Sequence, residues 1–294
     1  MKYPVPGLAA QAVSVGLIEQ AAASRGGLSV VGESRSRPVP AVIGPEESPT
    51  RAGHRSVALC EVIADGHPAR LITAIKAWAE SLAVLHQRSN RFGPAPPARR
   101  PWVLEPDYPP AHLRSRLDEP GLAGVLAEIR SNPGLRGALD RVNQTWTGRH
   151  WIHGNATTAN AVARAIGAYR WQVWLVDSES AGLGDPSWDL ATAYDALLLH
   201  GQTRRIDMRP AVSAFLDAYR SCEGPGRLSH PMLITRALLT SVELACSHSN
   251  AAEQPAGIPL RGLAQQALRR ASRLALTQAA PVPVAGLTTV PLAV

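Results

Sequence analysis

Lysine is nearly absent from this chain of 294 residues, in which only Lys2 and Lys76 occur and the other basic residues are arginine. The formal net charge of +7 is spread along the chain and forms no basic run interleaved with aromatic residues. We therefore expect no nucleic-acid partner. No apolar run reaches the roughly 18 residues that a transmembrane helix needs, and polar residues interrupt the apolar stretch 8–23. We expect neither a signal peptide nor a membrane partner, and thus a cytoplasmic protein.

Cysteine is scarce as well, since the chain has only Cys60, Cys222 and Cys246. Their spacing matches no metal-binding motif, and an odd number leaves at least one thiol unpaired. This usage is typical of a reducing compartment and of buried structural thiols. We expect no cysteine in a catalytic or metal-binding role.

The first 66 residues are rich in Gly, Pro and Ser, which predicts a small and irregular N-terminal unit. Short β-like runs at 28–31 and 39–43 are separated by turn residues, and a helix is predicted over 51–64. Asp65-Gly66 would end that helix. The N-terminal unit is therefore predicted to span 1–66.

The character of the sequence changes at Pro68. Apolar residues then recur at alternating spacings of four and three, which predicts an amphipathic helix that ends at Leu85-His86. The stripe consists of Leu71, Ile75, Trp78, Leu82 and Leu85. Residues 88–112 hold many prolines and arginines and are predicted to form an irregular surface connection.

The rest of the chain is predicted to be mostly helical. A helical stretch over 113–142 has breaks at Pro120 and Pro133, and a β region follows over 151–177. Further helices are predicted over 190–199, 212–219, 232–245 and 260–274. We predict one helical lobe over 67–278 and a Pro-rich, apolar tail over 279–294.

Within the β region, 16 residues separate Asn160 from Asp177. This length fits two strands and a tight turn near Gly167, and such a hairpin would bring both side chains to the same end. Trp171 and Trp174 fall on opposite faces of the second strand, so we expect both faces to be covered.

Three short segments follow one another in a fixed order: HGNATTAN at 153–160, LVDSE at 175–179 and GDPSWDLA at 184–191. Each alone is a weak signal, but their order makes the combination specific. Together they resemble the aminoglycoside phosphotransferase and choline kinase family, which has His-Gly-Asp followed by four residues and Asn, then a strand that ends in Asp, then Gly-Asp-Pro-x-Trp-Asp-Leu-Ala. With Leu85-His86, the resemblance covers about 68–275.

The resemblance implies an α+β, protein-kinase-like fold with a reduced N-terminal β lobe and a mostly helical C-terminal lobe. It implies ATP and Mg²⁺ as cofactors, with Asn160 and Asp177 as the metal and nucleotide ligands. Glu179, two residues further along an expected extended segment, would touch a second ion or the substrate. The residues implied to hold the catalytic loop by hydrogen bonds, without doing chemistry themselves, are His153, Asp185, Trp188 and Asp189.

The sequence departs from the family pattern at two points. Asn155 stands where the family has the catalytic aspartate, and an amide cannot act as a general base near neutral pH. The family also grips the nucleotide phosphates with a strand lysine paired with a helix glutamate, and neither lysine of this chain fits. Glu61 could be the glutamate, although a solvated helix residue is the more ordinary interpretation. An arginine near the strand 39–43 could replace the lysine.

Two hypotheses follow from this pattern. The first is a phosphotransferase, impaired in its base, that acts on a hydroxyl of a small molecule or of peptide Ser or Thr, in a natural-product or resistance pathway. The alternative is a pseudokinase that serves as a peptide- or metabolite-binding partner subunit of a tailoring enzyme. Acidic residues that could attract a cationic acceptor, but that are expected to be solvated, are Asp195, Asp207, Asp217 and Glu223.

Overall fold

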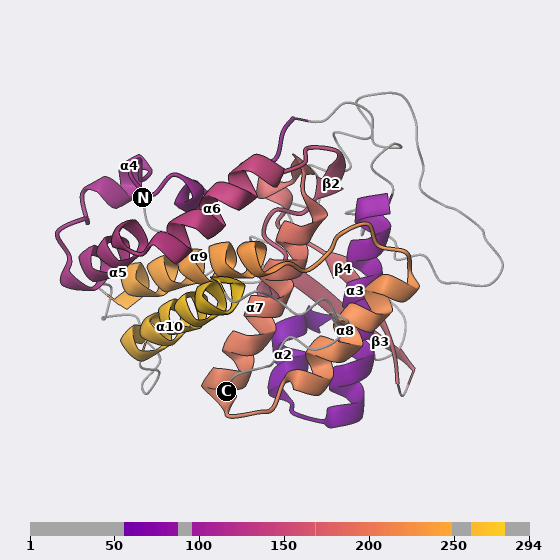
Figure 1. Cartoon of the computed structure of the whole chain (residues 1–294). Coiled ribbons are helices and arrows are strands. Elements are labelled where there is room, and N and C mark those ends of the chain that lie inside the picture. Colours follow the sequence, from indigo (N-terminus) through magenta and orange to yellow (C-terminus); the bar gives the residue numbers. More distant parts are fainter. Residues whose placement is uncertain (1–55, 88–95, 168, 249–259, 280–294) are drawn as a thin grey trace. The chain divides into compact units, whose positions relative to one another are not determined.

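The computed structural model of the chain describes residues 56–87, 96–167, 169–248 and 260–279. These residues form a mixed α+β fold that is mostly helical, with two small sheets (Figure 1). They divide into two compact units. The first holds 56–87, 96–99, 147–200 and 210–227, and the second holds 100–146, 201–209, 228–248 and 260–279.

The central helix of the first unit is α3 (Pro68–Gln87), as the apolar stripe predicts. Leu71, Ile75, Trp78 and Leu82 are buried, while Leu85 is half-buried and His86 takes the last buried position of the stripe. The helix packs against the two strands β2 (His150–Ile152) and β4 (Arg170–Leu175). A hydrogen bond adds to this packing, since Ser81 Oγ of α3 donates to the carbonyl of Val173 in β4 at 2.8 Å.

The larger sheet contains the predicted hairpin. Strand β3 (Ala161–Gly167) pairs antiparallel with β4 in a register that sets Ala161 opposite Leu175, and the chain turns just after Gly167. Strand β1 (Val57–Ala58) adds to the other edge of β3, which gives the order β1-β3-β4. The backbone N–H of Val176 donates to the carbonyl of Asn160 at 3.0 Å, so the two ends of the hairpin lie side by side.

The smaller sheet pairs β2 antiparallel with β5 (Gly182–Gly184). Pro97 bridges to the outer side of β5, and the N–H of Ala98 donates to the carbonyl of Leu183 at 2.8 Å. Glycine is required on this strand, since a Cβ on Gly182 would lie 2.7 Å from the backbone of Ala98. The small sheet thus fixes the chain directly before the segment 153–160, the predicted catalytic loop, and again at 182–184 after the hairpin.

Two predictions about the chain before β2 are wrong in part. The predicted helix over 51–64 begins only at Leu59, as α2 (Leu59–Ala64), because Val57 and Ala58 pair with β3 instead; 51–55 lie outside the described residues. The predicted end of the helix before Asp65 is confirmed. The connection 88–112 is not wholly a surface loop, since Ala98, Val103 and Leu104 are buried.

Two helices complete the first unit, namely α7 (Pro186–Arg204) and α8 (Arg209–Ser221), and both match predicted helices. Helix α7 ends four residues beyond the boundary of the unit, and α8 begins one residue before it. Phe215 of α8 meets Trp78 of α3 edge to face, with ring centroids 5.1 Å apart. Short 3-10 turns, η3 (Thr158–Asn160) and η4 (Ser178–Ser180), flank the hairpin. The hydrophobic core of this unit therefore runs from α3 to the sheet on one side and to α8 on the other.

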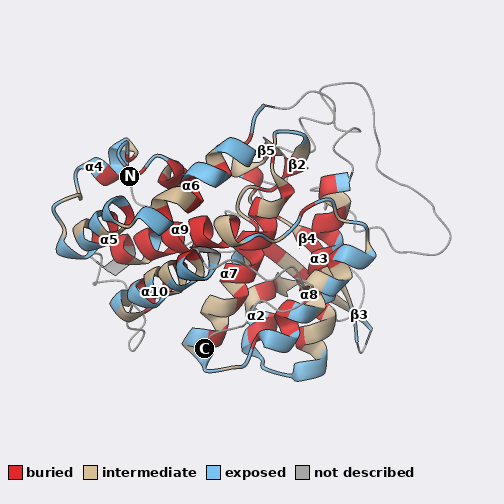
Figure 2. Cartoon of the chain, in the orientation of Figure 1, coloured by how far each residue is buried: buried red, intermediate tan, exposed pale blue. Residues whose placement is uncertain are grey.

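The second unit is a bundle of helices with a short 3-10 turn, η2 (Trp102–Leu104). Its helices are α4 (Ala111–Arg114), α5 (Pro120–Ser131), α6 (Pro133–Thr145), α9 (His230–His248) and α10 (Leu260–Ala279). Helix α9 packs against α5, α6 and α10, and its middle turns are buried on all sides (Figure 2). Pro120 and Pro133 each start a helix, which confirms the predicted breaks.

The predicted β-like runs 28–31 and 39–43 lie outside the described residues. Of the predicted tail 279–294, Ala279 ends α10 and 280–294 lie outside the described residues. The N-terminal unit over 1–66 and the reduced β lobe therefore stay predictions. None of the helices within the described ranges is long and apolar enough to span a membrane.

Candidate active site

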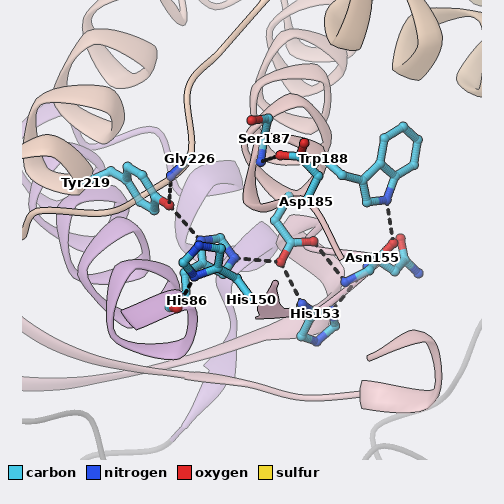
Figure 3. Close-up of polar contacts among 11 residues, drawn as sticks. His86, His150, His153, Asn155, Asp185, Ser187, Trp188, Tyr219 and Gly226 are labelled. Carbon is cyan, nitrogen blue, oxygen red and sulfur yellow. Dashed lines mark hydrogen bonds and ion pairs between the residues drawn. The ribbon is translucent and has the colours of Figure 1, made fainter. Parts of the chain in front are cut away.

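The segment 153–160, the predicted catalytic loop, leaves β2 and is held at its start by Asp189 of α7. Figure 3 shows His153 and Asn155 of this segment together with Trp188 of α7. The Asp189 carboxylate is fully buried and accepts the backbone N–H of His153 at 2.6 Å and that of Gly154 at 2.9 Å. A third donor, Nε2 of His86, lies 3.0 Å from the same carboxylate. A buried carboxylate is costly unless donors compensate it, and here three do.

His153 is buried and has both ring nitrogens engaged. Its Nδ1 accepts the backbone N–H of Asn155 at 3.3 Å, while Nε2 lies 2.8 Å from the carbonyl of Val176. A carbonyl only accepts, so Nε2 carries the proton and the ring is the neutral tautomer. The imidazole thus ties the loop to the end of the hairpin and leaves neither nitrogen open to a substrate.

Gly154 has a left-handed backbone, with φ of 79°, that favours glycine. A Cβ at this position would lie 2.3 Å from the carbonyl oxygen of Ser180. The Gly154 carbonyl accepts the indole N–H of Trp188 at 2.9 Å. The loop therefore packs closely against η4 on one side and against α7 on the other.

Asn155 is half-buried and its backbone carbonyl has two donors, the N–H of Thr157 at 2.8 Å and Nδ2 of Asn160 at 2.9 Å. Its side-chain amide makes no hydrogen bond to any of the described residues. The amide is thus available to a ligand, whereas the backbone is held firmly in place.

Asn160 is buried at the end of η3, and the hydrogen bond from its Nδ2 to the Asn155 carbonyl fixes the orientation of its side chain. The carbonyl of Asn155 can only accept, so the atom that contacts it is Nδ2, and the side-chain oxygen Oδ1 lies on the other branch of the amide. Oδ1 has no hydrogen-bond partner within the described part of the chain. An amide oxygen of this kind is a suitable ligand for Mg²⁺.

Asp177 follows β4 and has a left-handed backbone, with φ of 61° and ψ of 59°. Such a backbone costs a residue other than glycine about 1 kcal/mol or more, and it is found preferentially at functional sites. The bond between Val176 N–H and Asn160 carbonyl keeps the Asp177 and Asn160 ends of the hairpin adjacent. The backbones of Asn160 and Asp177, two residues whose side chains carry oxygens that Mg²⁺ accepts as ligands, are thus adjacent.

Glu179 is exposed, and the prediction of an extended segment around it is wrong. The left-handed Asp177 turns the chain directly into η4, so strand alternation no longer places Glu179 on the same side as Asp177. Within the described ranges no group of three or more His, Cys, Asp and Glu side chains could hold a metal ion. A role for Glu179 in metal binding stays a prediction.

Asp185 caps α7, since its Oδ1 accepts the backbone N–H of Ser187 at 2.9 Å and Pro186 occupies the first helical position. Trp188, in the first turn of the helix, is buried, and its indole N–H donates to the Gly154 carbonyl. All four residues expected to support the loop therefore contact the loop itself or the start of α7.

Sequence reasoning missed the contacts behind Asp189. His86 entered only as the end of a helix motif, and Tyr219 not at all, yet Nδ1 of His86 lies 2.7 Å from the Tyr219 hydroxyl. The one available signal was periodicity, because each residue continues the buried stripe of its helix. Periodicity predicts which face of a helix is buried, but not which side chain of another helix that face contacts.

The acidic residues considered for a cationic acceptor differ in their surroundings. Asp207 and Asp217 are exposed and pair with Arg209 and Arg220 at 2.7 Å each, so the expectation that they are solvated is confirmed. The arginine beside Asp207 lowers the pKa of that carboxyl. Asp195 is only 4% exposed, so the same expectation is wrong for it.

Known proteins are similar to this chain in sequence and in structure. The sequence matches the phosphotransferase enzyme family over residues 27–229, more than half of the chain. Among solved structures, a choline/ethanolamine kinase family protein from Mesorhizobium loti is similar at 19% identity and a TM-score of 0.44, over 76% of this chain and 66% of that one. No curated protein matches the chain. The extent of the family match shows that the chain belongs to the phosphotransferase enzyme family.

Proposed function

We propose that this chain is a cytoplasmic phosphotransferase that uses ATP and Mg²⁺ to phosphorylate a hydroxyl group of a small molecule or of peptide Ser or Thr. The observation that carries the proposal is the orientation of Asn160. Its amide nitrogen is bound to the Asn155 carbonyl at 2.9 Å, which leaves the amide oxygen for a metal at the end of the hairpin where Asp177 also lies.

The chemistry of the donor atoms fits Mg²⁺ bound to a nucleotide. One carboxylate and one amide are few ligands, but Mg²⁺ usually completes its shell with waters and phosphate oxygens. When bound, Mg·ATP supplies the phosphoryl group and neutralises its charge. The chain contributes position: Asp189 fixes the loop, and Asn160 and Asp177 would hold the metal.

Asn155 would orient the acceptor hydroxyl without taking its proton. The carbonyl oxygen of an amide accepts a hydrogen bond from a hydroxyl but is not a base near neutral pH. Loss of general-base catalysis costs typically ~10²- to 10⁴-fold in rate. We therefore expect slow but metal-dependent turnover.

A single-turnover assay with γ-labelled ATP tests the proposal. The acceptors are a panel of aminoglycosides, amino alcohols and Ser/Thr peptides, and the proteins are the wild type and Asp177→Ala. We expect labelled product from the wild type with at least one acceptor, and at least 10²-fold less from the variant, as for other losses of charge stabilisation. Equal transfer by both proteins, or none by either, would overturn it.

A pseudokinase that acts as a binding subunit is the second candidate. It is favoured by Asn155 together with the lack of lysine, because Lys76, the one lysine among the described residues, is exposed on α3. Replacing Asn155 by Asp separates the two candidates. If the chain is a pseudokinase, Asn155→Asp should leave the amount of pathway product unchanged. If it is an enzyme, the variant should change the rate of phosphate transfer.

A further inference from the structure

A chain of buried polar groups extends from the loop through three helices of the first unit. Asp189 of α7 contacts His86 of α3 at 3.0 Å, and His86 contacts Tyr219 of α8 at 2.7 Å. Tyr219 in turn accepts the backbone N–H of Gly226 at 3.0 Å. His86 and Asp189 are fully buried, and Tyr219 is 1% exposed.

The direction of each hydrogen bond follows from its ends. The Gly226 N–H can only donate, so the Tyr219 oxygen accepts there and its own proton remains for Nδ1 of His86. At the other end the Asp189 carboxylate accepts, so Nε2 of His86 carries the ring proton. Burial raises the pKa of Tyr219 far above its ordinary value, which keeps the phenol protonated as this direction requires.

The polypeptide packs closely around the Tyr219 side chain. A Cβ on Gly224 would lie 2.2 Å from the Tyr219 ring, and one on Gly226 would lie 3.0 Å from both the Tyr219 hydroxyl and Pro186. The segment 224–226 therefore closes over the phenol and contacts the start of α7. The ring planes of Tyr219 and His86 also meet edge to face, with centroids 5.7 Å apart.

Stability alone does not account for such a chain. Buried polar networks seldom stabilise a protein more than well-packed apolar side chains of similar volume would, but they do fix one geometry. The chain ends on the carboxylate that holds the N–H groups of His153 and Gly154, immediately before Asn155. Because Tyr219 donates to Nδ1 of His86, the ring proton lies on Nε2, and His86 donates it to that carboxylate.

We infer that Tyr219 and His86 are positioning residues for the catalytic loop: they orient the Asp189 carboxylate, and through it the backbone on which Asn155 stands. Neither residue would touch the nucleotide or the acceptor. The effect on turnover rests on the proposed function, whereas the effect on loop geometry does not.

Four variants of the full chain test the inference. Tyr219→Phe removes the hydroxyl and His86→Asn removes the donor to Asp189, whereas His86→Gln places an amide N–H close to the position of Nε2. Phe215→Leu is the matched control, since Phe215 is equally buried on α8 and packs on α3 but has no polar group. The readouts are thermal unfolding and the amide ¹H and ¹⁵N shifts of His153 and Gly154.

We expect Tyr219→Phe and His86→Asn to shift both amide resonances, and His86→Gln to restore them in large part. Phe215→Leu should lower the melting temperature but leave these resonances in place. Where turnover is measurable, Tyr219→Phe should lower kcat about 10- to 10²-fold with an unchanged KM for ATP, because misplacement by about an ångström has such effects.

Amides that stay in place in Tyr219→Phe, or that shift as much in Phe215→Leu, would overturn the inference. A wild type without turnover whose loop amides respond as expected would contradict the proposed function and support the inference. The two failures are therefore distinguishable.

Discussion

Asn155 stands on a backbone that other residues hold in place. Its carbonyl accepts bonds from Thr157 and Asn160, and its N–H donates to His153, so the loop is ordered around the amide that stands where the family pattern has a carboxylate. The departure from that pattern therefore concerns one side chain. We expect a carboxylate introduced at this position to stand on the same ordered backbone.

The first prediction is that Asn155→Asp accelerates phosphate transfer about 10²-fold, because a carboxylate can accept the hydroxyl proton that an amide cannot. The affinity for Mg·ATP should be unchanged. Single-turnover rates and a binding titration on the same preparation check both parts. A variant with unchanged affinity and no gain in rate would show that the missing base does not limit the reaction.

The second prediction concerns Gly154. Gly154→Ala should destabilise the fold by about 1–3 kcal/mol, because the left-handed backbone and the 2.3 Å approach to the Ser180 carbonyl both oppose a Cβ. The control is Gly124→Ala, at an exposed site inside α5 where a Cβ meets nothing within 4 Å. It should stabilise by about 0.5–1 kcal/mol. Urea unfolding measures both, and equal effects would contradict the close contact at Gly154.

At the scale of elements, α3 and α8 contact each other through two pairs of side chains, and His86 of α3 also contacts Asp189, which holds the loop. Trp78 meets Phe215 and His86 meets Tyr219, so one pair of contacts is apolar and the other polar. The polar pair makes the stability of the first unit depend on the protonation of a phenol. Such a dependence is measurable at alkaline pH.

The third prediction follows from the raised pKa of Tyr219. In the unfolded chain a tyrosine loses its proton near pH ~10, while in the folded chain Tyr219 still holds it. The folded state then binds more protons, so the stabilisation is fully present below pH ~10 and is lost above it, at about 1.4 kcal/mol per pH unit. Chemical unfolding from pH 9 to 11 should show a shallower loss for Tyr219→Phe than for the wild type. Parallel curves would contradict it.

The sequence predicts elements whose determinants are local. The stripe from Leu71 onward gives α3, Pro120 and Pro133 give the helix starts, and the turn after Gly167 gives the hairpin, because each depends on periodicity or on backbone preference within a few residues. It fails where a distant partner decides. Val57 and Ala58 become a strand only because β3 is available to pair with them.

The candidate site shows the same division. The motifs predict Asn160, Asp177 and Asp189 as site residues, since the spacing within each motif is fixed. The bond between His86 and Tyr219 joins residues 133 positions apart, and no local pattern encodes which buried polar side chains will meet. Asp195 is a similar case, because its burial depends on what packs over α7.

At the scale of the whole molecule, the residues that would bind Mg·ATP all lie in the first compact unit. The second unit is a helical bundle around α9. Nucleotide binding is thus expected to stabilise the first unit, by an amount that grows with the logarithm of the ligand concentration.

The measurement that tests the account most directly is a calorimetric titration of Mg·ATP into the wild type, Asp177→Ala, Asn160→Ala and Asn155→Asp. We predict binding that requires Mg²⁺, is retained in Asn155→Asp, and is weakened at least 10-fold in each of the other two variants, since each removes one oxygen ligand of the metal. Binding that is equal in all four proteins, or absent from the wild type, would contradict the claim that Asn160 and Asp177 hold a metal and nucleotide.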